Sequence, residues 1–113
     1  MDFEKDQRNY PRADNKLEVY YSTDAKKEKS QTISKDISAT GISFLVKEDF
    51  FPGDLLYLEL ILPHGAKSIQ TKAIIIRNWI ENEDKLVSLQ YFDINYHDFI
   101  TLLDYSLAFQ IEI

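Results

Sequence analysis

The sequence predicts an all-β domain, a six-stranded antiparallel β-barrel with a C-terminal α-helix. Three observations support this prediction. Segments rich in β-branched and aromatic residues follow one another from residue 17 to residue 92, with short polar or Gly/Pro turns between them. Apolar residues at helical spacing occur only after them. Six consecutive strands joined by short turns favour a closed barrel, because closure removes the exposed edges of an open sheet.

The first two strands are expected to form a hairpin. Residues 17–22 are β-branched and aromatic, and residues 32–34 alternate between polar and apolar side chains, which is typical of a half-buried strand. The mixed charge run at residues 24–29 indicates a solvated hairpin loop rather than a binding patch.

The remaining four strands follow in quick succession. They are expected at residues 42–46, 55–62, 68–80 and 86–92. Phe51-Pro52-Gly53-Asp54 has Pro and Gly in the order that a type II turn requires, and Pro63-His64-Gly65 ends the strand at 55–62.

A helix is expected from about residue 95. Asn95 can cap its N-terminus, with Asp98 three residues later as a variant of the capping box. The apolar residues of this helix recur every three to four positions, so its apolar face should close one mouth of the barrel. These residues are Phe99, Ile100, Leu102, Leu103 and Leu107.

Length and composition exclude several classes of protein. With 113 residues the chain is one domain, divided into a flexible N-terminal arm at 1–16 and the barrel with its helix at 17–113. A net charge of −6 argues against DNA or RNA as a ligand. The chain has no cysteine, and its histidines, His64 and His97, lack metal-ligand spacing, so no metal site or cofactor is expected. The N-terminus lacks a leader and no apolar run could span a bilayer, which predicts a cytoplasmic protein without membrane insertion.

Two groups of residues have the chemistry of a receptor for an anionic guanine nucleotide. Arg8 and Arg12 lie four residues apart, and Pro11 disfavours a helix there, so both should extend from one side of an extended arm. An arginine fork matches a phosphate or the O6/N7 edge of guanine. Asp36 and Ser38 share one face of a strand end; the carboxylate can accept from guanine N1 and N2.

Three further residues complete the expected site. Gly41 is expected to permit a positive φ and a close approach of the backbone. Arg77 and Trp79, two residues apart on the fifth strand, could add a phosphate contact and a stacking surface. A surface arginine in an ion pair and a core tryptophan would be the ordinary structural explanation of these last two.

These motifs together carry a family resemblance. RxxxR at residues 8–12, followed by DxSxxG at residues 36–41 in a strand-rich chain of about a hundred residues, resembles the PilZ domain. The resemblance implies a PilZ-like split barrel and a bacterial receptor for cyclic di-GMP. It also implies a downstream protein partner in the control of motility, exopolysaccharide or biofilm. Gln7 stands where many members carry another arginine, which leaves open whether one or two ligand molecules bind.

Two alternatives remain beside this receptor. An enzyme is disfavoured, because neither histidine has a partner at catalytic spacing and a small filled barrel leaves little room for a pocket. A PilZ-fold module that binds a protein and no nucleotide is the other alternative. Phe109, Ile111 and Ile113 alternate at the C-terminus, which suggests an exposed apolar strip that docks on a partner or forms a homodimer.

Overall fold

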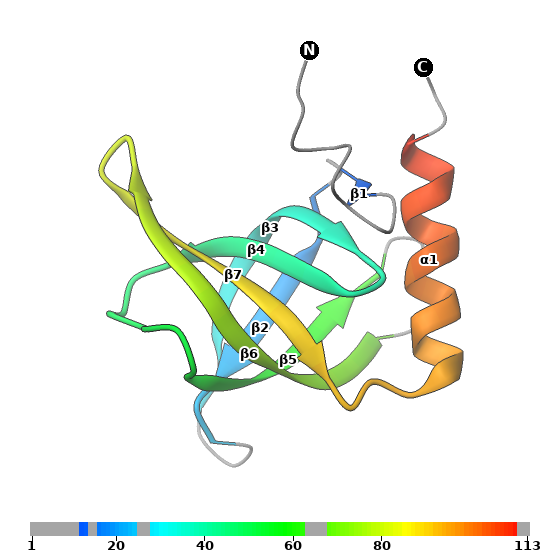
Figure 1. Cartoon of the computed structure of the whole chain (residues 1–113), viewed down its shortest axis with the longest axis horizontal. Helices are drawn as coiled ribbons and strands as arrows, with labels where there is room; N and C mark the ends of the chain where they lie inside the picture. The colour runs from blue at the N-terminus through cyan, green and yellow to red at the C-terminus, as the bar shows by residue number, and fades with distance from the viewer. Residues whose placement is uncertain (1–11, 14–15, 25–27, 63–67, 111–113) are drawn as a thin grey trace.

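The chain folds as a closed antiparallel barrel with a C-terminal helix, which confirms the predicted fold class. The computed structural model describes residues 12–13, 16–24, 28–62 and 68–110. Six strands close the barrel in the order β3-β2-β5-β6-β7-β4, with β4 returning to pair with β3 (Figure 1). The barrel strands are β2 (Glu18–Ser22), β3 (Ser30–Ser38), β4 (Gly41–Val46), β5 (Leu55–Ile61), β6 (Ser68–Glu81) and β7 (Asp84–Phe92).

A short additional strand, β1 (Arg12–Ala13), pairs with the end of β3. It lies inside the segment assigned to the arm, and its extended backbone agrees with the expectation from Pro11. Helix α1 (Tyr96–Gln110) contacts both β1 and β3, and Figure 1 shows α1 standing beside β1 at one end of the barrel. The short strand therefore lies between the barrel and the helix.

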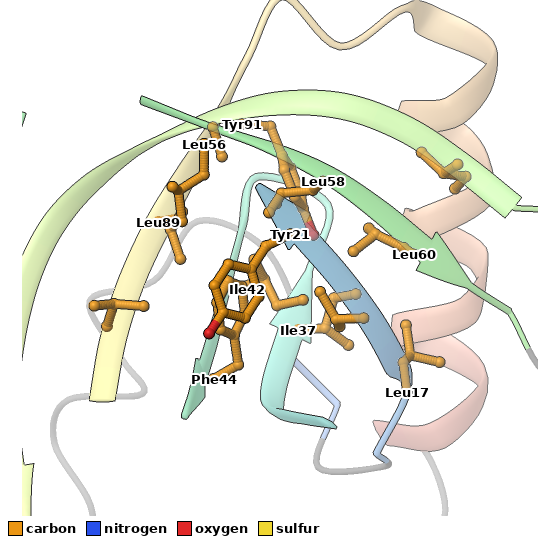
Figure 2. Packing of buried hydrophobic residues seen from close by; sticks show 14 of the residues in the cluster. Leu17, Tyr21, Ile37, Ile42, Phe44, Leu56, Leu58, Leu60, Leu89 and Tyr91 are labelled. Carbon is orange, nitrogen blue, oxygen red and sulfur yellow. The ribbon is translucent and has the colours of Figure 1, made fainter. Parts of the chain in front are cut away.

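The core fills the barrel from alternate positions of its strands. Ile42, Phe44 and Val46 of β4 are buried, as their alternation predicts. The ring of Tyr21 stacks on that of Phe44, with 5.4 Å between their centroids. Figure 2 shows Tyr21, Ile42 and Phe44 converging with side chains of β5 and β7 between the strands. The interior is thus occupied by protein side chains.

The predicted cap of α1 is present. The Asp98 amide donates to Asn95 Oδ1 at 2.8 Å, and Asn95 Nδ2 donates to Asp98 Oδ2 at 3.1 Å. Leu102 is fully buried against the barrel core, but Leu107, expected on the same face, is 39% exposed. The reason is geometric: five residues at 3.6 per turn rotate a side chain by about 140° around the helix.

The structure describes the backbone of only the first residue of the C-terminal strip. Because α1 continues to Gln110, Phe109 lies in the helix and not in an extended, alternating segment. Ile111 and Ile113 lie outside the described residues. Docking through this tail therefore stays a prediction without a structural counterpart.

Two turns determine the shape of the β5–β7 region. Asp54 N donates to Phe51 O at 3.0 Å and Gly53 has a φ of 99°, which confirms the predicted type II turn. Asn82 and Glu83 have φ values of 51° and 72°, as a type I′ hairpin turn requires. This tight turn lets β6 and β7 run further than expected, and their hairpin projects beyond the barrel at the upper left of Figure 1.

Candidate ligand-binding face

The DxSxxG motif lies where β3 ends and β4 begins. Ser38 Oγ accepts hydrogen bonds from the Thr40 amide at 3.2 Å and the Gly41 amide at 3.3 Å, so its hydroxyl organises the turn. Ser43 Oγ donates to Asp36 Oδ1 at 3.0 Å. The carboxylate is half-buried and is held on the outer surface of the barrel by this bond. Both motif side chains have the fixed positions that a recognition surface needs.

Of the two reasons predicted for Gly41, the structure shows the close backbone approach but not the positive φ. A Cβ built on Gly41 would stand 2.5 Å from the backbone oxygen of Leu89, which confirms the close approach. Its φ is not positive; of the glycines that the structure describes, only Gly53 has a positive φ. The expectation of left-handed backbone at Gly41 is therefore wrong, because β4 begins here in extended conformation directly against β7.

The strand register carries the site across the barrel. Asp36 pairs with Ser43, Ser43 with Ser88, and Ser88 with Arg77, so one row runs over β3, β4, β7 and β6. Directly opposed residues project to the same face of a sheet, and this face is the outside of the barrel. A register shift between Ile75 and Arg77 turns the arginine outward. The sheet thereby brings Asp36 and Arg77, distant in sequence, onto one surface row.

Sequence reasoning missed three members of this face. The buried Ser43 and the half-buried Ser88 complete the row, and the exposed Gln90 lies opposite Gly41 on the next row. Their signal was the period-2 rule, since each stands two residues from another outward-facing position. The register that joins the strands is a long-range property and could not be read from local spacing.

Of the two arginines of RxxxR, only Arg12 lies within the described residues. Arg12 in β1 is the Cα partner of Ser38 in β3, so the structure brings the backbone of the second motif arginine beside the DxSxxG motif. Arg8 lies outside the described residues, as does Gln7. The predicted convergence of both motifs is thus seen for the Arg12 backbone.

Arg77 and Trp79 form a stacked pair on the outer surface. The Arg77 guanidinium carbon lies 4.4 Å from the centre of the Trp79 ring. Trp79 is half-buried and outside the core, and its Nε1 donates to Glu81 Oε1 at 3.3 Å. Lys35 forms an ion pair with the same carboxylate at 2.8 Å, and this contact lowers the pKa of Glu81. The stack is held in place from β3 as well as from β6.

A buried hydroxyl lies beneath the motif. Tyr91 is 8% exposed, and its hydroxyl has no hydrogen-bond partner among the described residues. Burial, and to a smaller extent the negative charge of Asp36, raises the pKa of Tyr91 far above its ordinary value. The Tyr91 amide donates to Thr40 O at 3.0 Å, which ties β7 to the motif turn. The motif is therefore anchored on the core as well as on its neighbouring strands.

The described ranges hold neither a cluster of metal ligands nor a helix that could cross a membrane. In the described ranges, no group of three His, Cys, Asp or Glu side chains is arranged to hold a metal ion. His97 is exposed near the start of α1, and His64 lies outside these ranges. None of the described helices has the length and apolar character to cross a membrane.

Comparison with known proteins adds the family. The family model described as PilZ domain matches residues 6–108. No curated protein matches the chain. The Bacillus subtilis inhibitor of motility (MotI/DgrA) superposes with a TM-score of 0.81 and 30% identity over 90% of this chain and 50% of its own. The chain therefore spans half the length of that protein.

Two further solved structures share the fold at lower identity. The PilZ domain of YcgR from Escherichia coli, solved with c-di-GMP, has a TM-score of 0.69 and 14% identity over 94% of this chain and 93% of its own. MrkH from K. pneumonia has a TM-score of 0.70 and 19% identity over 94% and 51%. The family model matches nearly the whole chain, and the structure is a closed six-stranded barrel. This protein therefore belongs to the PilZ domain family.

Proposed function

We propose that this chain is a receptor for cyclic di-GMP, which binds on the outer face of β3, β4, β7 and β6. The observation that carries the proposal is the pairing of Arg12 with Ser38, because it joins the RxxxR segment to the DxSxxG motif. The family match and the c-di-GMP complex of the YcgR PilZ domain support the choice of ligand.

Each proposed residue has a distinct role. Arg8 and Arg12 bind phosphate or the O6/N7 edge of guanine through their forked donors. Asp36 accepts from guanine N1 and N2, and its bond from Ser43 fixes the carboxylate for that task. Ser38 shapes the motif turn, while Gly41 lets the backbone lie close to β7.

Arg77 and Trp79 extend the same face. Arg77 shares a surface row with Asp36, and its stacked guanidinium keeps donors free for a phosphate. Trp79 offers a ring edge and part of a face for a base. Because the chain carries a net charge of −6, attraction for the ligand must come from these local cations.

The two arginines can supply part, but not all, of the binding free energy. Two charge-assisted contacts at about 1.5 to 3 kcal/mol each supply roughly 3 to 6 kcal/mol, against about 8 for micromolar affinity. Base stacking and main-chain contacts must supply the rest. Replacing Arg8 or Arg12 by alanine should therefore weaken binding by about tenfold to a hundredfold, and the double change should abolish it.

We infer a signalling receptor rather than an enzyme, acting in the cytoplasm through a downstream protein. The name of the Bacillus subtilis neighbour, an inhibitor of motility, supports motility control as the process regulated. Gln7 in place of a further arginine favours one bound ligand over two.

Isothermal titration calorimetry with cyclic di-GMP tests the proposal. The comparison uses the wild type, the Arg8→Ala/Arg12→Ala double variant and Lys29→Ala. Lys29→Ala is the matched control because it also removes a surface cation, but one that pairs with Glu59 on β5 and lies outside the proposed site. The control should bind as the wild type does, and the double variant should not bind. Equal affinity in all three would remove this face as the site.

A thermal-shift panel separates ligand classes. At about a hundred times its dissociation constant, a ligand stabilises the fold by roughly 2.7 kcal/mol, which raises the melting temperature by several degrees. Cyclic di-GMP should shift the transition, while cyclic GMP, GTP and cyclic di-AMP should not. No response to any of them would favour a PilZ-fold module that binds only protein.

A further inference from the structure

The outer edge of β6 beyond Ile75 has no neighbouring strand in the described structure. β5 pairs with β6 only as far as Leu55 opposite Ile74. The 51–54 turn then covers Ile75, through Gly53 N to Ile75 O at 2.7 Å and Ile75 N to Asp54 O at 2.9 Å. From residue 76 to residue 81, β6 is hydrogen-bonded to β7 alone. Six residues of strand thus present a free edge on the projecting hairpin (Figure 1).

The geometry of the turn determines which main-chain groups point outward. In a hairpin with a two-residue turn, the closing pair exchanges both of its hydrogen bonds, and every second pair along the strands does the same. The closing pair is Glu81 with Asp84, so Trp79 and Arg77 also direct their main-chain groups to β7. Asn78 and Ile80 therefore direct theirs toward the free edge.

This edge is only partly protected, by the register shift at its start and by the charges of Arg77 and Glu81. It contains no proline and no lysine. Ile76 and Ile80 are 54% and 65% exposed, and the nearby Phe51 is 60% exposed. The Asn78 side chain donates to Phe50 O at 2.8 Å, and a hollow of about 250 Å³ lies between the hairpin and the 48–51 loop. The edge therefore offers exposed apolar surface that a partner could bury.

We propose that this edge is an interface for a second copy of the same chain, paired antiparallel to form a two-fold symmetric dimer. Outward-facing residues must meet outward-facing residues, which allows Asn78 opposite Asn78, Ile80 opposite Ile80, or Asn78 opposite Ile80. The last register alone places Arg77 opposite Glu81 of the partner subunit and Trp79 opposite its own copy. By symmetry the ion pair forms twice.

Charge and aromatic contacts select this register. Opposite charges and aromatic rings directly across two strands attract each other. Glu81 already accepts from Trp79 and Lys35 in its own chain, and a carboxylate has further lone pairs for an arginine fork. The same register brings the hairpin turn of the partner subunit up to residue 75, where the 51–54 turn ends the free edge. The interface engages Arg77 and Trp79, which also belong to the proposed ligand-binding face, so it is tested on the protein without nucleotide.

Charge reversal tests the interface. Sedimentation velocity from about 10 μM to about 1 mM should detect a weak dimer of the wild type. Arg77→Glu and Glu81→Arg should each weaken it by at least about tenfold, because each change converts two attractions into two repulsions. The Arg77→Glu/Glu81→Arg double variant should restore the dimer. Circular dichroism melting of each variant confirms that it is folded.

The absence of cysteine allows a second test of the register. Cα atoms of a non-hydrogen-bonded pair lie about 4.5 Å apart, within the range that a disulfide spans. Under mild oxidation Trp79→Cys should therefore form covalent dimers, and the control Ile80→Cys, which faces Asn78, should not. A monomer at every concentration, failure of the double reversal to restore the dimer, or cross-linking through residue 80 would each overturn the proposal.

Discussion

Replacing Gly41 by alanine should damage both stability and ligand binding, for a reason that can be worked out from the structure. The added Cβ would stand 2.5 Å from the Leu89 backbone oxygen, whereas ordinary contacts begin near 3.4 Å. Hydrogen-bonded strands lie about 4.8 Å apart, and β4 and β7 would have to move apart locally by about a further 0.9 Å to relieve this contact. The neighbour is main chain held in two strand pairs, so it has little freedom to yield.

The expected size follows from the energy of overpacking. Inserting a methyl group into a filled site destabilises a protein by about 1 to 3 kcal/mol. For a domain of 113 residues this corresponds to a fall in melting temperature of roughly 4 to 15 °C. The displaced strand end also carries the Ser38 turn, so the affinity for cyclic di-GMP should fall as well. Thermal unfolding by circular dichroism and titration calorimetry measure the two effects.

Gly53 provides the matched control. Nothing lies within 4 Å of a Cβ at this position, but its φ of 99° strains any other residue. Gly53→Ala should therefore cost about 1 to 2 kcal/mol of stability through the backbone alone. It should leave ligand affinity unchanged once the protein is folded. If Gly41→Ala melts within about 1 °C of the wild type and binds equally well, the close approach of β4 to β7 is not what the site requires.

Three further predictions concern single contacts. Ser43→Ala should weaken cyclic di-GMP binding by about tenfold in calorimetry with little change in melting temperature, because it removes the donor that holds Asp36. Asn95→Ala should lower the free energy of unfolding in urea by about 1 kcal/mol through loss of the α1 cap, and unchanged stability would refute that role. Burial and a hydrogen bond to Glu48 raise the pKa of Tyr21 to about 12, so the unfolded chain loses this proton first, near pH 10. Stability should therefore be retained below pH 10 and fall between pH 10 and about 12, and Tyr21→Phe should show a shallower fall in the same urea titrations.

The alternation of apolar and polar residues predicted most of the barrel, because on β4 and β7 the apolar positions are those that face the core. It failed where the strand itself is irregular. Ser34 is fully buried, and its Oγ accepts from the Leu17 amide at 2.8 Å, while Ile33 is 51% exposed. The register shift between Ser34 and Asp36 then turns the motif carboxylate outward. A shift of this kind leaves no periodic signal in the sequence.

The candidate site was predictable as residue types but not as an arrangement. Asp36, Ser38 and Gly41 lie within six residues, so their proximity follows from the chain itself. The row that adds Ser88 and Arg77 depends on two strand registers, which long-range packing determines. β1 is only two residues long, too short for any hydrophobic period to indicate. Its pairing with β3 is a tertiary property.

The position of β1 has a consequence for how a signal could leave the site. A two-residue strand has few hydrogen bonds of its own, so its placement depends on β3 on one side and α1 on the other. A ligand bound against β3 and a protein bound to α1 would therefore act on the same short segment. By thermodynamic linkage, each would change the affinity of the other by the same factor. The affinity of a protein for α1 would then depend on whether a ligand occupies the β3 face, which α1 does not itself form.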